Sequence, residues 1–239
     1  MNTENFSKYL SEVKYRVDGT PKIVAEQTKI FKQKYSFSGK SFSERLVIWD
    51  YIWNNSPDEW TRMQSYLFID SYIKKQDKLV NSWETIKFWQ KRVDNWGYCD
   101  ALSRIYTKIL ETIPDKVLKQ LEQWNKSNNF WDRRQSLISL LYFSRTKKVF
   151  LPFDRLIRLI DSRISDNEYY VQKAVGWSLK ELYNVYPVET LKYLNDNIEK
   201  ISSIAFSPAT EKINKLDKDK LKRKRKLNRQ HGIKQRRVS

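Results

Sequence analysis

Histidine and cysteine are almost absent from this chain of 239 residues. Its one histidine, His231, lies near the C-terminus, and its one cysteine is Cys99. One cysteine excludes an internal disulfide framework and a thiolate metal cluster. A Ser-His-Asp triad, a two-His-one-carboxylate iron site and a His-rich zinc site would each need histidine in the folded body. An enzyme with this composition must work with carboxylates, aromatic rings and cations, and we expect no metal and no cofactor.

Glycine and proline are also scarce, with five and six residues. So few turn-forming residues argue against many short strands and favour long helices joined by short polar loops. The sequence has neither a Walker-type loop nor a G-x-G-x-x-G motif. It has no apolar run of about 18 residues and no hydrophobic leader segment, so we expect a soluble, cytoplasmic protein.

Charge of one sign is in excess. The formal net charge is +18, and residues 211–239 alone hold 13 Lys/Arg against three acids, a net +10. Such density favours a polyanion, because each neutralised phosphate releases counterions. A charge that serves only solubility stays open. An anionic membrane surface is the main rival, but residues 211–239 lack the large apolar residues of an inserting helix. We therefore expect nucleic acid as the partner, no membrane, and a nucleoid-associated protein.

Apolar residues recur at helical spacing, and helix-start signals separate the segments. Helices are expected over 4–17, 22–35, 41–54, 57–75, 82–89, 96–112, 116–125, 130–143, 155–164, 169–183, 190–197 and from Ser207 onward.

Helices opened by Pro or Ser alternate with helices preceded by Asp or Asn, at a repeat of about 35 to 40 residues that is typical of helix-pair solenoids. We predict an all-α, HEAT-like α-solenoid over residues 1–213, with the second helices of the pairs lining one face. Residues 214–239 have almost no apolar periodicity and are predicted to be a basic, disordered tail that tethers the protein to DNA.

Three of the second helices carry charged and aromatic residues on one face. Trp96 and Asp100 are four residues apart, Trp131 and Arg134 are three apart, and Lys173, Trp177 and Lys180 follow at i, i+4 and i+7. Each group alone has an ordinary explanation: a helix-dipole acid, an arginine paired with Asp132 or solvent, or an indole under lysine stems.

Taken in order, these segments resemble the DNA alkylation repair family, the AlkD-type alkylpurine DNA glycosylases, over about residues 40 to 210. The resemblance lies in four stretches: Gly39-x-x-x-x-Glu44-Arg45, Trp96-x-x-x-Asp100, Trp131-x-x-Arg134 and Gln172-Lys173-Ala174-Val175-Gly176-Trp177. Two positions depart from the family pattern. Lys180 stands where the best-known members have Arg, and Asn95 stands where they often have a second aromatic residue.

The resemblance implies hydrolysis of the N-glycosidic bond of cationic N3- or N7-alkylated purines in double-stranded DNA, by a monomer and without a base-flipping pocket. Asp100 would be the catalytic carboxylate. Trp96 and Trp177 would pack against the backbone beside the lesion, Arg134 would hold a phosphate, and Lys173 and Lys180 would extend the cationic wall. Two alternatives remain: a non-catalytic HEAT-repeat protein that binds damaged or branched DNA, and a protein-interaction solenoid.

Overall fold

The computed structural model describes residues 29, 37–56 and 59–236, with side chains as far as Asn228. All regular elements in these ranges are helical, which confirms the all-α prediction. The chain forms two compact units, Met1–Val93 and Asp94–Ser239. The helices predicted over 4–17 and 22–35 lie outside the described residues, apart from Lys29.

The first unit contains α3 (Phe42–Asn55), α4 (Glu59–Asp70), α5 (Gln76–Ile86) and the 3-10 helix η1 (Lys87–Arg92). Its tryptophans form a core: the rings of Trp53 and Trp89 stack with centroids 4.7 Å apart, and both are fully buried. Glu44, in the first stretch of the family resemblance, completes a capping box with Ser41 at the start of α3. This stretch therefore stabilises the unit.

The helix expected from residue 82 begins six residues earlier, at Gln76, and gives way to η1 after Ile86. The prediction took Ser82 as a helix cap. Instead Ser82 is buried inside α5, where its hydroxyl donates to the carbonyl of Leu79 at 2.8 Å. A serine can satisfy its hydroxyl in this way in the middle of a helix, so its presence does not mark a helix start, and the predicted start at residue 82 is wrong.

The second unit contains α6 (Trp96–Leu110), α7 (Pro114–Asn125), α8 (Phe130–Ile138), η2 (Ser144–Thr146), α9 (Phe153–Asp161), α10 (Tyr169–Val185), α11 (Pro187–Asp196), α12 (Ser203–Ala209) and α13 (Lys215–Arg236).

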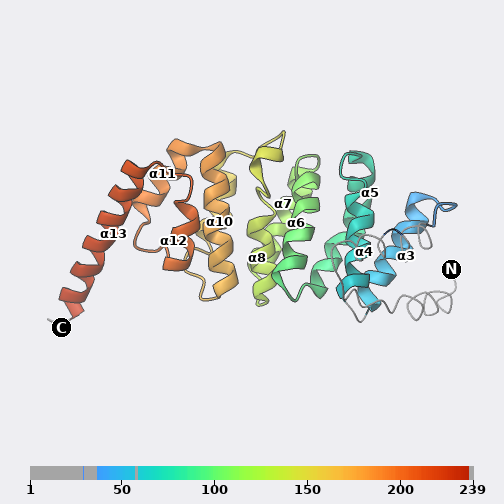
Figure 1. Ribbon diagram of the computed structural model, residues 1–239, viewed down its shortest axis with the longest axis horizontal. Helices are drawn as coiled ribbons and strands as arrows, with labels where there is room; N and C mark the ends of the chain where they lie inside the picture. The colour runs from blue at the N-terminus through green and yellow to red at the C-terminus, as the bar shows by residue number, and fades with distance from the viewer. Residues whose placement is uncertain (1–28, 30–36, 57–58, 237–239) are drawn as a thin grey trace. The chain divides into compact units, whose positions relative to one another are not determined.

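Helices α6, α8 and α10 lie side by side in this unit (Figure 1), as predicted for the second helices of successive pairs. Buried polar contacts tie them together. The Gln135 amide of α8 donates to Ser103 of α6 at 2.7 Å, and the Ser178 hydroxyl of α10 donates to the Leu137 carbonyl at 3.1 Å. Since buried donors are costly to leave unpaired, these bonds help to fix the register of the three helices.

Gly176 lets α12 approach α10 at backbone distance. A Cβ atom at this position would meet the carbonyl oxygen of Ala205 at 2.4 Å and Pro208 Cγ at 2.5 Å. No side chain fits there without a shift of α12. The glycine of the Gly-Trp pair therefore brings α12 close to Trp177.

The helix expected over 130–143 ends at Ile138. Phe143 has φ 47°, a left-handed conformation that an α-helix cannot contain. Residues 139–152 form a connection that includes η2 and carries Phe143 and Arg145.

The prediction of a disordered tail is wrong for the residues described. Lys215–Arg236 form α13 (Figure 1). Its Lys, Arg and Leu residues are strong helix formers, and Asn214 caps its first turn by accepting the N–H of Asp217 at 2.9 Å. Leu221 is buried, and Arg225 donates to the carbonyl of Ile201 at 3.0 Å. These anchors supply the tertiary contacts that the sparse apolar pattern hides.

The last helix predicted before the tail was also misplaced. It was expected to open at Ser207-Pro208, whereas α12 begins at Ser203 and has Pro208 inside it. Ser202 is the actual cap, since its hydroxyl accepts the N–H of Ala205 at 3.0 Å.

Among the residues described, no helix combines the length and the apolar character needed to cross a membrane.

Candidate DNA-lesion site

A cavity of about 430 Å³ opens in the second unit and is lined by residues of α6, α8, α10 and α12 and by Glu211, which follows α12. Its lining is Trp96, Asp100, Arg134, Ile138, Tyr169, Tyr170, Lys173, Trp177, Lys180, Pro208 and Glu211. All six residues predicted from the sequence are among them. These residues, predicted on three separate helices, thus come together in one shared site, which we call the lesion cavity. Trp131, which the sequence groups with Arg134, is not part of its lining.

Trp96 is the first residue of α6 and is 58 % exposed. Asn95, where relatives often have an aromatic residue, caps the helix: its side-chain oxygen accepts the N–H of Tyr98 at 3.1 Å. The cap fixes the start of the helix and leaves the indole of Trp96 on the rim of the cavity. A large exposed aromatic ring offers a flat apolar face to a ligand.

Asp100 lies one turn further along α6 and forms an ion pair with Arg134, whose Nη2 is 2.7 Å from its Oδ1. Burial raises the pKa of Asp100 above its ordinary 3.8, and the charge and hydrogen bond of Arg134 oppose this effect without cancelling it. The Asp100 side chain is 31 % exposed, so one edge still reaches the cavity. The carboxylate is therefore partly desolvated, and Arg134 is its one ion-pair partner among the described side chains.

Arg134 does not lie as a phosphate ligand would. The residue is only 7 % exposed, and its second terminal nitrogen donates to the backbone carbonyl of Tyr170 at 3.0 Å. Its guanidinium thus bridges α6 and α10 behind the carboxylate of Asp100. This geometry favours a positioning role for Arg134 over the predicted grip on DNA.

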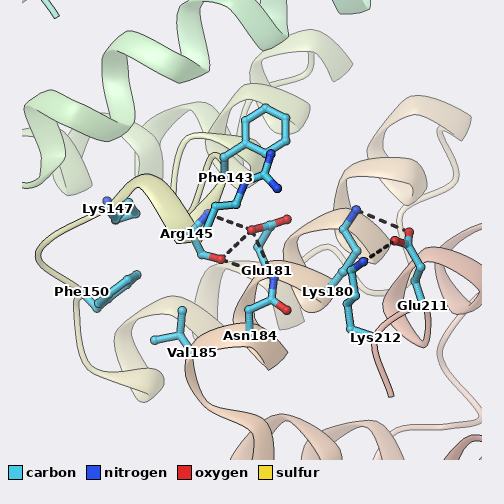
Figure 2. Close-up of a pocket in the computed structure, with 11 residues that line it drawn as sticks. Phe143, Arg145, Lys147, Phe150, Lys180, Glu181, Asn184, Val185, Glu211 and Lys212 are labelled. Carbon is cyan, nitrogen blue, oxygen red and sulfur yellow. Dashed lines mark hydrogen bonds and ion pairs between the residues drawn. The ribbon is translucent and has the colours of Figure 1, made fainter. Parts of the chain in front are cut away.

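Trp177 and Lys180 form the opposite wall, on α10. Lys180 Nζ lies 5.8 Å from the centre of the Trp177 ring, within range of a cation–π interaction, and 3.5 Å from Glu211 (Figure 2). Lys173 is exposed one turn before the indole. The predicted stripe of Lys173, Trp177 and Lys180 therefore faces the cavity.

Sequence reasoning missed four residues at or beside this cavity. Tyr169 and Tyr170 extend the α10 stripe by one turn, a signal that their spacing from Lys173 already contained. Tyr142 packs on Trp177 with ring centres 5.6 Å apart, and burial together with the charge of Asp100 raises its pKa to about 12. Glu211 was counted only as tail charge, because no pattern linked it to α10.

Among the residues described, no group of three or more His, Cys, Asp or Glu side chains could hold a metal ion.

Comparison with known proteins gives the site its context. Residues 24–213 match the family model described as DNA alkylation repair enzyme. The chain belongs to this family. Membership confirms the AlkD-type resemblance and supports a role in DNA repair, with DNA as the partner.

Two solved structures share the fold of this family member. The structure titled predicted DNA alkylation repair enzyme from Enterococcus faecalis has a TM-score of 0.65 at 17 % identity, covering 89 % of this chain and 94 % of that one. AlkD2 from Streptococcus mutans has a TM-score of 0.57 at 18 % identity, covering 87 % and 99 %. Both confirm the predicted helical fold class. No curated protein matches the chain.

Proposed function

We propose that this DNA alkylation repair family member is an alkylpurine DNA glycosylase, which hydrolyses the N-glycosidic bond of N3- or N7-alkylated purines in duplex DNA. The observation that carries the proposal is the carboxylate of Asp100, partly desolvated and open to a cavity walled by Trp96 and Trp177. A desolvated anion between aromatic faces suits a substrate whose positive charge moves during the reaction.

The chemistry follows from the charge of the substrate. An alkylated purine is cationic, so when the bond from C1′ to the base nitrogen breaks, the electron pair moves to the base and neutralises it. Positive charge then develops on the deoxyribose, where the Asp100 carboxylate stabilises it. Water adds to C1′ and releases one proton. Because the leaving base is already activated, no general acid is required, and a preorganised charge supplies about 3–4 kcal/mol.

The surrounding residues have separate tasks in this proposal. Trp96 and Trp177 contact the backbone beside the lesion and offer π-faces to the cation. Lys173 and Lys180 attract phosphates. Arg134 holds Asp100 in place and keeps it ionised, in place of the phosphate contact expected from the sequence. That the protein acts as a monomer stays a prediction.

One observation favours the alternative of a DNA-binding protein without catalysis. The Arg134 ion pair already neutralises part of the charge of Asp100. A carboxylate that serves only to hold this arginine would look similar, and the cavity would then recognise damaged DNA without breaking a bond.

Base release separates the two. Purified protein is incubated with methylated duplex DNA, and free 3-methyladenine and 7-methylguanine are measured beside the variants Asp100→Asn and Asp154→Asn. Asp154 is an exposed acid of α9 outside the cavity and serves as the matched control. The proposal expects release by the native protein and Asp154→Asn but not by Asp100→Asn. DNA binding without release by the native protein would favour the alternative.

We further propose that α13 contributes a DNA-tethering surface. Lys222, Arg223 and Lys226 are exposed, whereas Leu221 and Arg225 anchor the helix. Deleting the helix would uncover its anchor site, so alanine at the three exposed positions is the cleaner test. We expect weaker binding with a salt dependence flatter by about 2 to 3, and base release at low salt that persists. An unchanged salt slope would rule this role out.

A further inference from the structure

A second and larger cavity, of about 800 Å³, adjoins the lesion cavity. Figure 2 shows the residues that line this second cavity. Its lining is Phe143, Ser144, Arg145, Lys147, Phe150, Lys180, Glu181, Asn184, Val185, Glu211 and Lys212. The two cavities share Lys180 and Glu211, so the ion pair of these residues is the wall between them. A polymer bound in one cavity would therefore reach the other cavity if it extended past this ion pair.

Most cations of the second cavity are weakly neutralised. Lys180 and Lys212 approach the same carboxylate, Glu211, at 3.5 and 3.3 Å, so two ammonium groups share one half-exposed acid. Arg145 is exposed and lies against the ring of Phe143, with its guanidinium carbon 5.5 Å from the ring centre. No ion pair of Arg145 occurs among the described side chains. These three cations are available to an anion.

The other charged residues of the cavity are committed elsewhere. Glu181 is buried and accepts both the backbone N–H and the hydroxyl of Ser144, at 2.8 and 2.6 Å. Lys147 donates to the carbonyl and hydroxyl of Thr107 at 3.2 and 3.1 Å, and burial lowers its pKa to about 8. The net charge offered to a ligand is therefore positive.

The connection that carries Arg145 is held in a strained shape. Phe143 has φ 47°, which is costly for a bulky side chain and persists only where the surroundings enforce it. The bonds from Ser144 to Glu181 hold the next residue of the connection in place. Dashed lines end on the carboxylate of Glu181 in Figure 2. Strain of this kind concentrates at binding sites, and here it places an aromatic ring next to Trp177 and a guanidinium at the mouth of the cavity.

We propose that the second cavity is a subsite for the sugar–phosphate backbone of a DNA strand that leaves the lesion cavity. Arg145, Lys180 and Lys212 bind its phosphodiesters, and Phe143 covers the deoxyribose between them. In the free protein Glu211 takes the place of a phosphate on its two lysines. The identity of the polymer rests on the proposed function; the cations and the strained connection are independent of it.

Two opposite charge changes test this subsite by binding of unmodified duplex DNA, which needs no base release. The double variant Arg145→Ala/Lys212→Ala should raise Kd at least about tenfold and flatten the dependence of log Kd on log salt by about 2. The control Lys119→Ala/Lys192→Ala removes two exposed lysines, one on α7 and one on α11, and neither lines the cavity. It should change binding much less.

Glu211→Gln should act in the other direction and tighten binding about two- to fivefold, because the lysines lose their competing carboxylate. Glu189→Gln, an exposed acid of α11, controls for the general gain of removing one negative charge. All altered side chains are exposed, so folding is preserved. The subsite would be overturned if Arg145→Ala/Lys212→Ala weakened binding no more than Lys119→Ala/Lys192→Ala, or if Glu211→Gln tightened binding no more than Glu189→Gln. Absence of base release by the native protein, with these binding results intact, would overturn the glycosylase proposal alone.

Discussion

Two adjacent arginines of α8 pair with carboxylates of opposite character. Arg133 donates two hydrogen bonds to Asp166, at 2.7 and 3.2 Å. Burial opposes the ionisation of Asp166, but the bonds from Arg133 and from the N–H of Glu168 outweigh it and lower its pKa. Arg134 gives Asp100 one bond, burial prevails, and the pKa of Asp100 is raised.

The difference separates a structural acid from a reactive one. The side chain of Asp166 is 5 % exposed and its charge is satisfied from several sides, so it can attract little more. Asp100 is 31 % exposed, accepts one bond from Arg134 and faces the lesion cavity. A carboxylate that is incompletely stabilised in the free protein gains most when positive charge appears next to it. The predictions below test whether this distinction holds.

Exchanging each carboxylate for an amide should give the largest contrast. Asp100→Asn is expected to slow base release about 100- to 1,000-fold, because the developing cation loses its counter-charge. Asp166→Asn should leave the rate within about threefold at low temperature and lower the free energy of unfolding by about 2–4 kcal/mol, since Arg133 loses its buried partner. Single-turnover rates and urea unfolding measure the two effects. A comparable loss of rate in both variants would remove the distinction.

The two arginines should differ in the same way. Arg134→Gln removes the cation that is ion-paired with Asp100, so the acid limb of the rate against pH should move to higher pH, with a rate about tenfold lower near neutrality. Arg133→Gln should destabilise the fold and leave the acid limb in place. A limb that does not move in Arg134→Gln would show that Arg134 does not act through Asp100.

Gly176→Ala tests the wall of the lesion cavity. The added methyl group would meet the α12 backbone at 2.4 Å, so we expect α12 to shift and Tm to fall by about 5 °C or more. Gly39→Ala is the control, since a Cβ there has no atom within 4 Å. Equal Tm values for both variants would contradict the close approach of α10 and α12.

The smallest expected effect is on the pH dependence of stability, to which Asp100 and Asp166 should contribute with opposite sign. The folded pKa of Asp100 lies above 3.8, so its contribution to stability is present below pH 3.8 and is lost as pH rises through the folded value. The folded pKa of Asp166 lies below 3.8, so its contribution is present above pH 3.8 and is lost as pH falls through the folded value. Relative to Asp100→Asn the native protein should gain stability as pH falls from 7 to about 3, and relative to Asp166→Asn it should lose stability. Urea midpoints across this range should change in opposite directions for the two comparisons; changes of one sign would be inconsistent with the difference between Asp100 and Asp166.

Helical spacing was sufficient to group the site. Residues four apart on α6 and three or four apart on α10 share a face, and stacking of α6, α8 and α10 brings those faces into one cavity. The helical spacing of apolar residues likewise predicts the helix pairs from the sequence alone. Asn95 departs from the family pattern, but an asparagine directly before a helix is typical of an N-cap, and this is the role that Asn95 has.

The sequence could not predict which partner each individual side chain reaches. Nothing in Arg133-Arg134 indicates that one side chain reaches Asp166 and the other Asp100, because Asp100 comes from α6 and Asp166 from the connection between α9 and α10. The helix α13 was missed for a similar reason. Its anchors are the buried Leu221 and Arg225, which donates to the carbonyl of Ile201 and lies over the ring of Phe206 in α12, and local composition does not reveal such contacts.

The central claim is that the ionised form of Asp100 performs the chemistry. Its most direct test is the single-turnover rate of 3-methyladenine release from methylated duplex DNA as a function of pH, for the native protein and for Asp100→Asn. The native rate should be constant near neutrality and fall at acid pH, with a midpoint above 3.8, while the Asp100→Asn rate should be low and without that limb. An acid limb that is identical in both proteins would contradict the account.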